Sequence, residues 1–374
     1  MAADRAPAPS TGDVLLLVGT MKGAFLFHAD GERRTWRMDG PHFRGQAVYA
    51  MAFDQRGGRR RVLASGQSMH WGSMVQTSDD FGATWSDPDR QNVRFPDGSG
   101  LALANVWQIR PGRDSEPGVL YAGVEPAALF RSTDAGDSWS VVEGLLNHEH
   151  RPRWQPGGGG LCLHTIVLDP ADDRRMAVAI STGGVYRTDD GGRTWQARNH
   201  GVRAEFLPDK HPEFGQCVHK VVNHPSRPER LYLQNHWGLY RSDDWGDHWT
   251  DIDNGVPSDF GFAMEVHPHE PDTAYIVPLD SDLFRIVPDA RLRVYRTRDA
   301  GASWQPLQDG LPQDGAFESV LRDGMASDGH ARSAGIYFGT RSGKLFGSAD
   351  GGEHWMSISD SLPPITCVKA VTLA

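Results

Sequence analysis

Short runs of apolar residues alternating with polar ones recur along the chain, separated by turns rich in glycine, proline and aspartate. One stretch shows four of them in succession: LCLHTIVLD at 161–169, RMAVAIST at 175–182, GVYRTDD at 184–190 and TWQAR at 194–198. A period of two is typical of β-strands, because successive side chains of a strand point to opposite faces. The pattern therefore predicts a four-stranded antiparallel sheet joined by tight turns.

The turn between the third and fourth run of each unit carries a recurring phrase, Ser/Thr-x-Asp-x-Gly-x-Ser/Thr/His-Trp, which we call the box. In one copy its residues are Ser242, Asp244, Gly246, His248 and Trp249. Such an aspartate accepts hydrogen bonds from turn N–H groups, and the glycine supplies a positive φ. The large indole suits the space between neighbouring sheets. We expect the box aspartates to be structural, not catalytic.

The box tryptophans give the length of the repeat. They are Trp85, Trp139, Trp195, Trp249, Trp304 and Trp355, at spacings of 54, 56, 54, 55 and 51 residues. A weaker copy, HADGERRTW at 28–36, ends 49 residues before Trp85. A period near 50 residues with short alternating strands is typical of β-propeller blades of four strands each.

The two ends of the chain supply the remaining blade. Runs at 13–20 and 24–30 look like second and third strands with no first strand before them, and 365–373 looks like a first strand with nothing after it. Paired together, they close the ring and leave no free sheet edge. The sequence predicts an all-β, seven-bladed propeller as one domain over 13–374, preceded by a flexible tail over 1–12.

Composition narrows the partners. A net charge of −10 and a pI near 5.9 argue against nucleic acid or an anionic membrane as a partner. No stretch approaches the roughly 18 consecutive apolar residues of a membrane-spanning helix, and the first residues lack a signal-peptide pattern. Three cysteines do not form a disulfide framework. We expect a cytoplasmic protein with a small-molecule substrate, and the oligomeric state stays open.

Six good boxes and one decayed copy resemble the Asp-box (BNR) repeat superfamily, and most of all its bacterial sialidase-like or glycosyl-hydrolase-like BNR/YVTN propeller proteins. The resemblance implies the fold and leaves the activity open, because the superfamily includes sialidases, xyloglucan-cleaving glycosidases, sorting-receptor ectodomains and photosystem assembly factors. Sialidases use six blades, an early Arg-Ile-Pro motif and three arginines that grip the sugar carboxylate. This sequence predicts seven blades and contains no Arg-Ile-Pro.

Aligning the first strands of the blades places one residue per blade around the central funnel opposite the boxes. These ring residues are Tyr49, Asn105, His164, His219, Phe262, Glu318 and Lys369. Blades three and four both read Cys-x-His there, as Cys162–His164 and Cys217–His219, and residues i and i+2 of a strand share a face. This N/S set would suit one zinc, iron or copper ion. The alternative is a metal-free ring of hydrogen-bonding groups.

Two long connections, 143–160 and 200–216, overhang the same sector, and connections of this length are usually lids or binding loops. The turns between second and third strands face the same side. They contribute Lys22, His70, Glu125, His236, Asp280, Asp282, Arg341 and Lys344. Among these and the ring, the predicted substrate-binding residues are Tyr49, Asn105, Lys369, Arg341, His70, His236, Glu125 and Asp280.

The favoured hypothesis is a hydrolytic or lyase-like enzyme for a small polar, anionic molecule. His164 and His219 would hold the metal or act as acid and base, and Glu318 would be a general base or acid. The cations Lys369, Lys22 and Arg341 would bind negative charge.

Two alternatives stay open. A glycoside hydrolase would pair Glu318 with a second carboxyl group, from Glu125, Asp280 or Asp282. Its sugar platform would be Trp71, Trp154 or Trp237. A non-catalytic interaction scaffold would not need an inward-facing polar ring.

Overall fold

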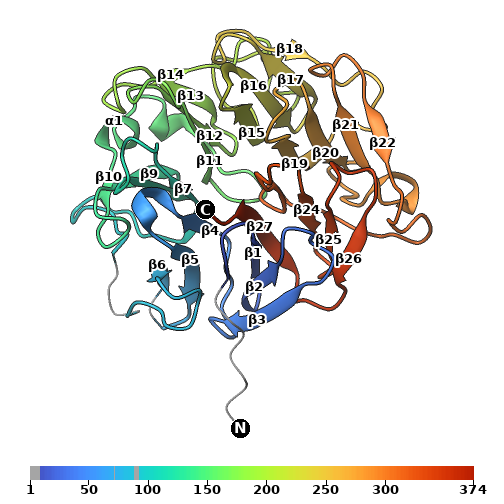
Figure 1. Cartoon of the computed structure of the whole chain (residues 1–374). Helices are drawn as coiled ribbons and strands as arrows, with labels where there is room; N and C mark the ends of the chain where they lie inside the picture. The colour runs from blue at the N-terminus through green and yellow to red at the C-terminus, as the bar shows by residue number, and fades with distance from the viewer. Residues whose placement is uncertain (1–8, 71, 88–91) are drawn as a thin grey trace.

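The protein is an all-β ring of seven antiparallel sheets around a central axis, as the sequence predicts (Figure 1). The computed structural model describes residues 9–70, 72–87 and 92–374. Residues 1–8 of the predicted tail and the candidate platform Trp71 lie outside the described residues. Six sheets have four strands, and blade one has three among the residues described.

In blades one to six the strands follow one another outward from the axis in chain order. Blade one consists of β4 (Met51–Asp54), β5 (Arg61–Ser68) and β6 (Gly72–Ser78). Blade two consists of β7 (Asn105–Pro111), β8 (Leu120–Glu125), β9 (Ala128–Ser132) and β10 (Ser140–Val141). Blade three consists of β11 (Leu163–Leu168), β12 (Met176–Ile180), β13 (Gly184–Thr188) and β14 (Gln196–Ala197). Blade four consists of β15 (Val218–His224), β16 (Arg227–Asn235), β17 (Leu239–Ser242) and β18 (Thr250–Asp251). Blade five consists of β19 (Gly261–Val266), β20 (Ala274–Pro278), β21 (Val294–Thr297) and β22 (Gln305–Leu307). Blade six consists of β23 (Met325–Ser327), β24 (Ile336–Gly339), β25 (Leu345–Ser348) and β26 (Met356–Ser359).

Helices are few and short. They are α1 (Glu143–Leu146) and the 3-10 turns η1 (Arg56–Gly58), η2 (Arg151–Arg153) and η3 (Pro288–Ala290). Within the described part of the chain, none is long and apolar enough to cross a membrane.

Blade seven joins both ends of the chain. Its order from the axis outward is β27 (Ile365–Thr372), β1 (Val14–Thr20), β2 (Gly23–Ala29) and β3 (Arg37–His42). The β1 and β27 strands are antiparallel and lie side by side at the centre of the ring (Figure 1). Every residue of β1 is buried. The predicted closure is confirmed, and it satisfies the backbone groups of an inner strand that would otherwise be a free edge.

The hydrophobic core lies between neighbouring blades, because each sheet presents apolar side chains on both faces. Leu120 and Phe130 of blade two pack with Leu63 and Val75 of blade one, for example, and all four are buried. Each pair of adjacent blades forms such a cluster. Continuous packing around the ring explains why the inner strands are buried on both faces.

The box hairpins have the predicted structural role. In blade four, Ser242 Oγ donates to Asp244 Oδ1 (2.7 Å), and the Gly246 N–H donates to Ser242 Oγ (2.8 Å). Gly246 has φ 87°, a left-handed conformation that glycine adopts without strain. The Trp249 indole N–H donates to the Arg198 carbonyl of blade three (2.8 Å). This box therefore fixes its own turn, and its indole ties blade four to blade three. The indoles of Trp139 and Trp195 instead donate to the carbonyl of the glycine in their own box.

Candidate functional site

Arg322, which was not among the predicted site residues, makes contacts with three blades near the propeller axis. Arg322, in the connection that leads into β23, lies over the rings of Trp107 and Phe262, with its Cζ 5.5 and 5.7 Å from their centroids. Its Nη1 donates to Cys162 Sγ at 3.6 Å. One guanidinium thus contacts blades two, three and five, and it occupies the place where the sequence predicted an open funnel.

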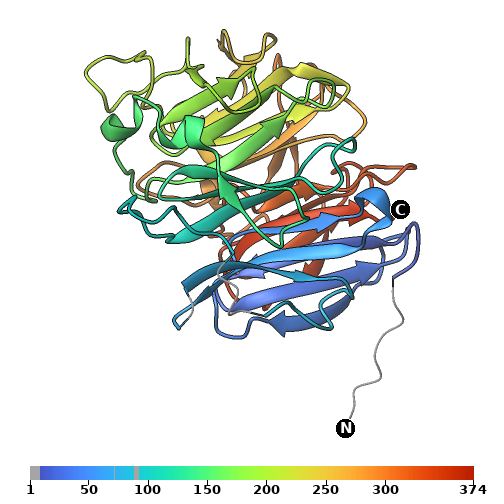
Figure 2. The ribbon, with the colours of Figure 1, turned by 90° about the vertical axis from the view of Figure 1, so that its left-hand side faces the viewer.

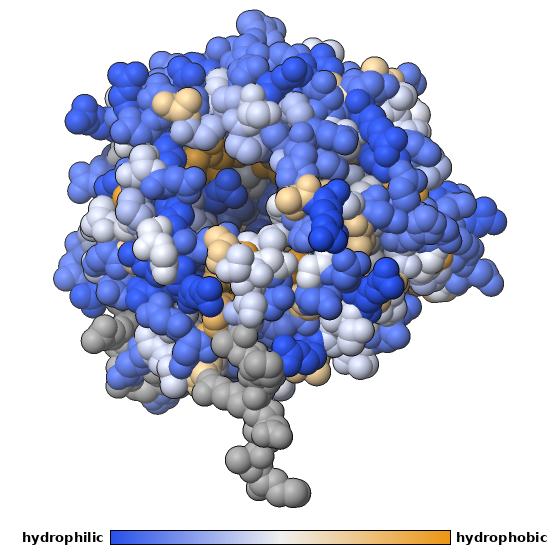
Figure 3. Space-filling model, in the orientation of Figure 1, coloured by the Kyte–Doolittle hydropathy of each residue, from blue (hydrophilic) through white to orange (hydrophobic). Residues whose placement is uncertain are grey.

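A buried ion cluster forms the next layer of the channel. Asp323 is paired with Lys220 of blade four and, at 3.3 Å, with Lys369 of blade seven. Burial alone raises the pKa of Asp323, but the two ammonium groups outweigh burial and hold that pKa well below its usual range. Beyond this layer, on the face that Figure 3 shows, the centre is hollowed, and a cavity of about 200 Å³ is lined in part by Arg110 and Glu265.

Glu318 does not occupy the ring position that the alignment gave it. The first strand of blade six ends at Ser327, so Asp328 and not Asp323 corresponds to Asp169 at the end of β11. The residue equivalent to His164 is therefore Asp323. The phrase MASD at 325–328, which matches the strand end IVLD in blade three, was the available signal.

Glu318 instead secures a turn at the rim of the ring. It accepts a hydrogen bond from Ser342 Oγ (2.5 Å) and pairs with Lys344 (2.9 Å), both in the β24–β25 turn. Its side chain is 3% exposed. Among the described residues, the polar partners of the Glu318 side chain are thus Ser342 and Lys344 and not the ring histidines.

His164 holds two blades together. Its Nε2–H donates to the Val218 carbonyl of blade four (3.0 Å), so Nδ1 accepts from Thr165 Oγ1 (3.0 Å). The ring is buried, and burial holds its pKa well below the usual value, so it is neutral. The strand has a β-bulge at His164, between Leu163 and Thr165.

The other predicted substrate-binding residues are largely engaged in the scaffold. Tyr49 packs on the Trp107 ring at 4.9 Å, and Glu125, opposite Asn105 in the sheet, accepts from the Trp107 indole (2.9 Å). Arg341 donates to the Ile365 carbonyl (3.5 Å). His70 and Asp280 lie on exposed turns of blades one and five, and Lys369 is paired with Asp323. The catalytic roles of His164, His219 and Glu318 stay predictions. The same holds for the substrate-binding roles of the residues named in this paragraph.

A cavity of about 960 Å³ lies over blades three and four, where the two long connections meet. Figure 2 shows both connections on the side of the ring opposite the C-terminus. The lining comes from 153–158 and 206–215, from the β16–β17 turn and from the β20–β21 connection. The side chains that line it include Phe206, Asp209, Glu213, Cys217, His236, Trp237 and Asp282.

The first connection, 143–160, is fastened to blade three. Trp154 is buried and its indole donates to the Tyr186 hydroxyl (2.9 Å), which in turn donates to His150 Nδ1 (3.0 Å). The His150 ring stacks on Phe214 of the second connection at 4.0 Å. Trp154 is thus a packing residue and not a sugar platform, and the two connections form a joint wall.

The cavity combines an aromatic wall with carboxylates. Phe206 and Trp237 lie with their ring centroids 5.2 Å apart. Asp209, Glu213 and Asp282 line the same space, and the His236 Nε2–H donates to Asp282 Oδ2 (3.4 Å). Trp237 and Asp282 were candidates from the sequence. The sequence analysis did not single out Phe206 or Asp209, since nothing in a loop's composition indicates which side chains turn inward.

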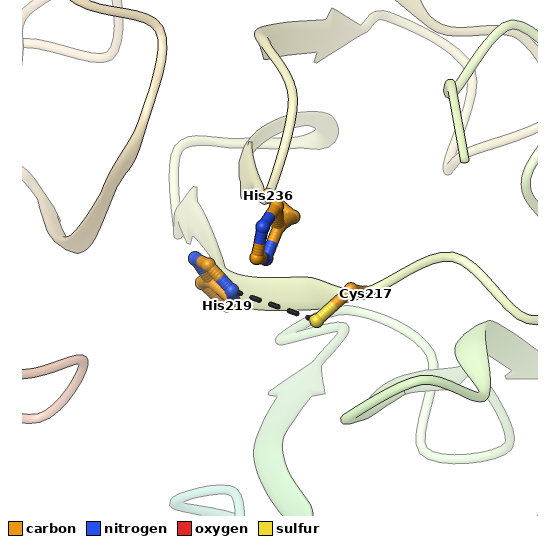
Figure 4. Close-up of side chains that lie close together, drawn as sticks. All are labelled: Cys217, His219 and His236. Carbon is orange, nitrogen blue, oxygen red and sulfur yellow. Dashed lines mark hydrogen bonds between the residues drawn. The ribbon is translucent and has the colours of Figure 1, made fainter. Parts of the chain in front are cut away.

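At the floor of the cavity, Cys217, His219 and His236 point toward one another (Figure 4). His219 Nδ1–H donates to the Gly261 carbonyl (2.6 Å), which leaves Nε2 unprotonated, 3.6 Å from Cys217 Sγ. Burial holds the pKa of His219 well below its usual value, so this ring is neutral. Burial also lowers the pKa of His236. Of the four predicted metal ligands, this cluster includes Cys217 and His219, joined by His236 from the next turn.

Comparison with known proteins supports a likeness to xyloglucan-cleaving propellers. No protein-family model matches the chain. It is 24% identical over 298 residues to a probable oligoxyloglucan-reducing end-specific xyloglucanase of Neosartorya fischeri, covering 69% of this chain and 34% of that protein. A xyloglucanase of Paenibacillus sp. is 22% identical over 75% of this chain and 28% of its own length. The chain thus spans about a third of the length of the curated relatives it matches.

Solved structures share the propeller fold. An ancestral GH74 enzyme superposes with a TM-score of 0.56 at 18% identity, over 84% of this chain and 39% of that chain. YCF48 bound to D1 peptide superposes with a TM-score of 0.50 at 14% identity, over 95% of this chain and 88% of the other.

The expectation of an enzyme for a small anionic molecule is wrong. The relatives act, by their names, on xyloglucan, a polysaccharide, and the glycoside hydrolase alternative fits them better. The structure supplies a physical reason: two of the cations meant to bind an anion, Lys369 and Arg341, are occupied by Asp323 and a backbone carbonyl.

Proposed function

We propose that the protein is a glycoside hydrolase that binds an oligosaccharide of the xyloglucan type in the cavity over blades three and four. One observation carries the proposal: the aromatic wall of Phe206 and Trp237 faces the same space as three carboxylates. Sugar rings stack their C–H faces on indoles, and hydrolysis of a glycosidic bond needs two carboxyl groups. The resemblance to the Asp-box superfamily, which includes xyloglucan-cleaving glycosidases, supports the same class.

The chemistry assigns different tasks to the two carboxyl groups. One protonates the departing glycosidic oxygen, while the other attacks the sugar carbon or activates a water molecule. Asp282 suits the second task, because the hydrogen bond from His236 orients its carboxyl group toward a fixed partner. Glu213 and Asp209, on the second long connection, are the candidates for the acid.

Hydrolysis of xyloglucan oligosaccharides, measured as new reducing ends, tests this proposal. Asp282→Asn and one of Glu213→Gln and Asp209→Asn are expected to lower kcat by about 10²- to 10⁴-fold, the usual effect of removing an acid or base. Asp314→Asn, at an exposed position in the β22–β23 connection, is the matched control and keeps wild-type activity. Full activity in all three cavity variants, or no product from the wild-type protein, would refute the assignment.

A second candidate is a non-catalytic, peptide-binding scaffold. It is favoured by the superposition with peptide-bound YCF48, which extends over nearly the whole of both chains. Such a scaffold would use the cavity's apolar wall without its carboxylates. Binding of an extended peptide with micromolar affinity, together with no release of reducing ends from any oligosaccharide, would select this function over hydrolysis.

A further inference from the structure

We propose that Cys217, His219 and His236 bind one divalent transition-metal ion of the zinc type, with an open coordination position toward the cavity. Their ligand atoms lie within 4.8 Å of one another, and they are the one such group found within residues 9–70, 72–87 and 92–374. None of its three ligands is a carboxylate to which the proposed hydrolysis is assigned, and Asp282 takes part only by contacting His236. It goes beyond the proposed function and can be tested without any sugar.

The spacing of the cluster matches tetrahedral coordination. With Zn–S near 2.3 Å and Zn–N near 2.0 Å, tetrahedral geometry separates the sulfur and nitrogen by about 3.5 Å. The observed distance from Cys217 Sγ to His219 Nε2 is 3.6 Å. His236 lies on a turn, with its ring centroid 5.3 Å from that of His219, so a small ring movement brings its nitrogen into range. One thiolate and two imidazoles are typical zinc ligands.

The surroundings orient both imidazoles as ligands. His219 Nδ1–H is fixed by the Gly261 carbonyl, and the lone pair of Nε2 therefore points into the cluster. Asp282 accepts a hydrogen bond from His236, the carboxylate–histidine contact that commonly supports a bound metal. Both rings are held neutral by burial, which is the form that binds metal. If the two imidazoles served only for packing, neither would need a hydrogen-bond partner outside the cluster to fix its orientation.

The thiol is the group that changes on binding. Burial raises the pKa of Cys217, so the free protein carries a protonated thiol that donates toward His219 Nε2. A metal ion displaces this proton and accepts one lone pair from Cys217 Sγ and one from His219 Nε2. Cys217 and His236 line the cavity, so the fourth coordination position faces it, as in metal sites that bind water or an exchangeable ligand.

Metal analysis of protein purified without a histidine tag tests the inference. After incubation with zinc chloride and desalting, we expect one zinc ion per chain by elemental analysis. Cobalt(II) should give a thiolate-to-metal charge-transfer band and intense visible bands of a tetrahedral site. Cys217→Ser and His236→Gln are expected to weaken zinc binding by at least about 10-fold, and Asp282→Asn by about 10- to 100-fold.

Cys162→Ser is the matched control. It alters the same Cys-x-His spacing on the neighbouring strand, but its sulfur contacts Arg322 and lies outside the cluster, so zinc binding is retained. Wild-type protein that retains no zinc, or Cys217→Ser protein that keeps both zinc and the cobalt spectrum, would overturn the inference. An equal loss of zinc binding in the Cys162→Ser protein would also overturn the inference. Because uptake is read without substrate, an absence of hydrolysis leaves these outcomes unchanged.

Discussion

Removal of residues 365–374 is expected to prevent the closed ring from forming. This truncation deletes β27, whose Ile365, Cys367 and Val368 are buried, and it exposes the inner edge of β1. Each buried apolar side chain contributes roughly 1.5–3 kcal/mol, so their loss with that of the strand pairing consumes most of the roughly 5–15 kcal/mol that keeps a domain folded. The truncated protein should aggregate or lose its cooperative melting transition, as followed by circular dichroism and size-exclusion chromatography.

Truncation after Leu373 is the control for this experiment. It removes only Ala374, which is exposed and donates its N–H to the Gln55 side chain. That protein should melt within a few degrees of the full chain. A truncation at 364 that still melts cooperatively, at a similar temperature, would mean that the ring is not closed by the chain ends.

The second large effect is expected for Asp323→Ala. The substitution leaves the ammonium of Lys220, whose side chain is 6% exposed, buried without its partner. Breaking a buried ion pair on one side typically costs about 3–5 kcal/mol. Chemical denaturation should show this loss in the free energy of unfolding. The double variant Asp323→Leu with Lys220→Met should recover much of it, because a buried pair replaced by apolar groups of similar volume is often neutral or stabilising.

The same pair predicts an acid sensitivity. The pKa of Asp323 is lower in the folded protein than in the unfolded chain, so its ionisation stabilises the fold at any pH above the ordinary aspartate value of about 3.9. That contribution is lost as the pH falls below this value toward the folded-state pKa. The Asp323→Leu, Lys220→Met protein should lose less stability than wild type between pH 5 and 2, by about 1 kcal/mol or more. Parallel curves for both proteins would contradict the role of the pair.

The fold could be predicted because every repeat predicts one blade with the same order of strands and turns. Six tryptophans at nearly equal spacing and two incomplete ends leave little choice of architecture. The position of Glu318 was misjudged because the first strand of blade six is followed by Asp328 and Gly329, without the proline that follows Asp169 in blade three and His267 in blade five. Arg322 and Asp323 precede this strand and contact other blades.

The lengths of the connections indicated where the site lies, but they did not indicate which side chains line it. The two long connections do form the cavity, as their lengths indicate, yet the inward side chains depend on how Trp154, His150 and Phe214 pack. The Cys-x-His motifs of blades three and four look identical in sequence. Both histidines lie at a β-bulge and donate to a backbone carbonyl of the next blade, but His219 also has Cys217 and His236 as neighbours. Strand periodicity does not report such local changes.

A crystal structure of the Asp282→Asn variant with a xyloglucan oligosaccharide tests the central claim most directly. The substitution removes the carboxylate charge while keeping the shape of the cavity, so a bound substrate should persist. The account predicts a sugar ring stacked on Trp237, between the connections 143–160 and 200–216, with its glycosidic oxygen within hydrogen-bond reach of Glu213 or Asp209. Sugar bound in the central hollow or on the box face, with this cavity empty, would contradict it.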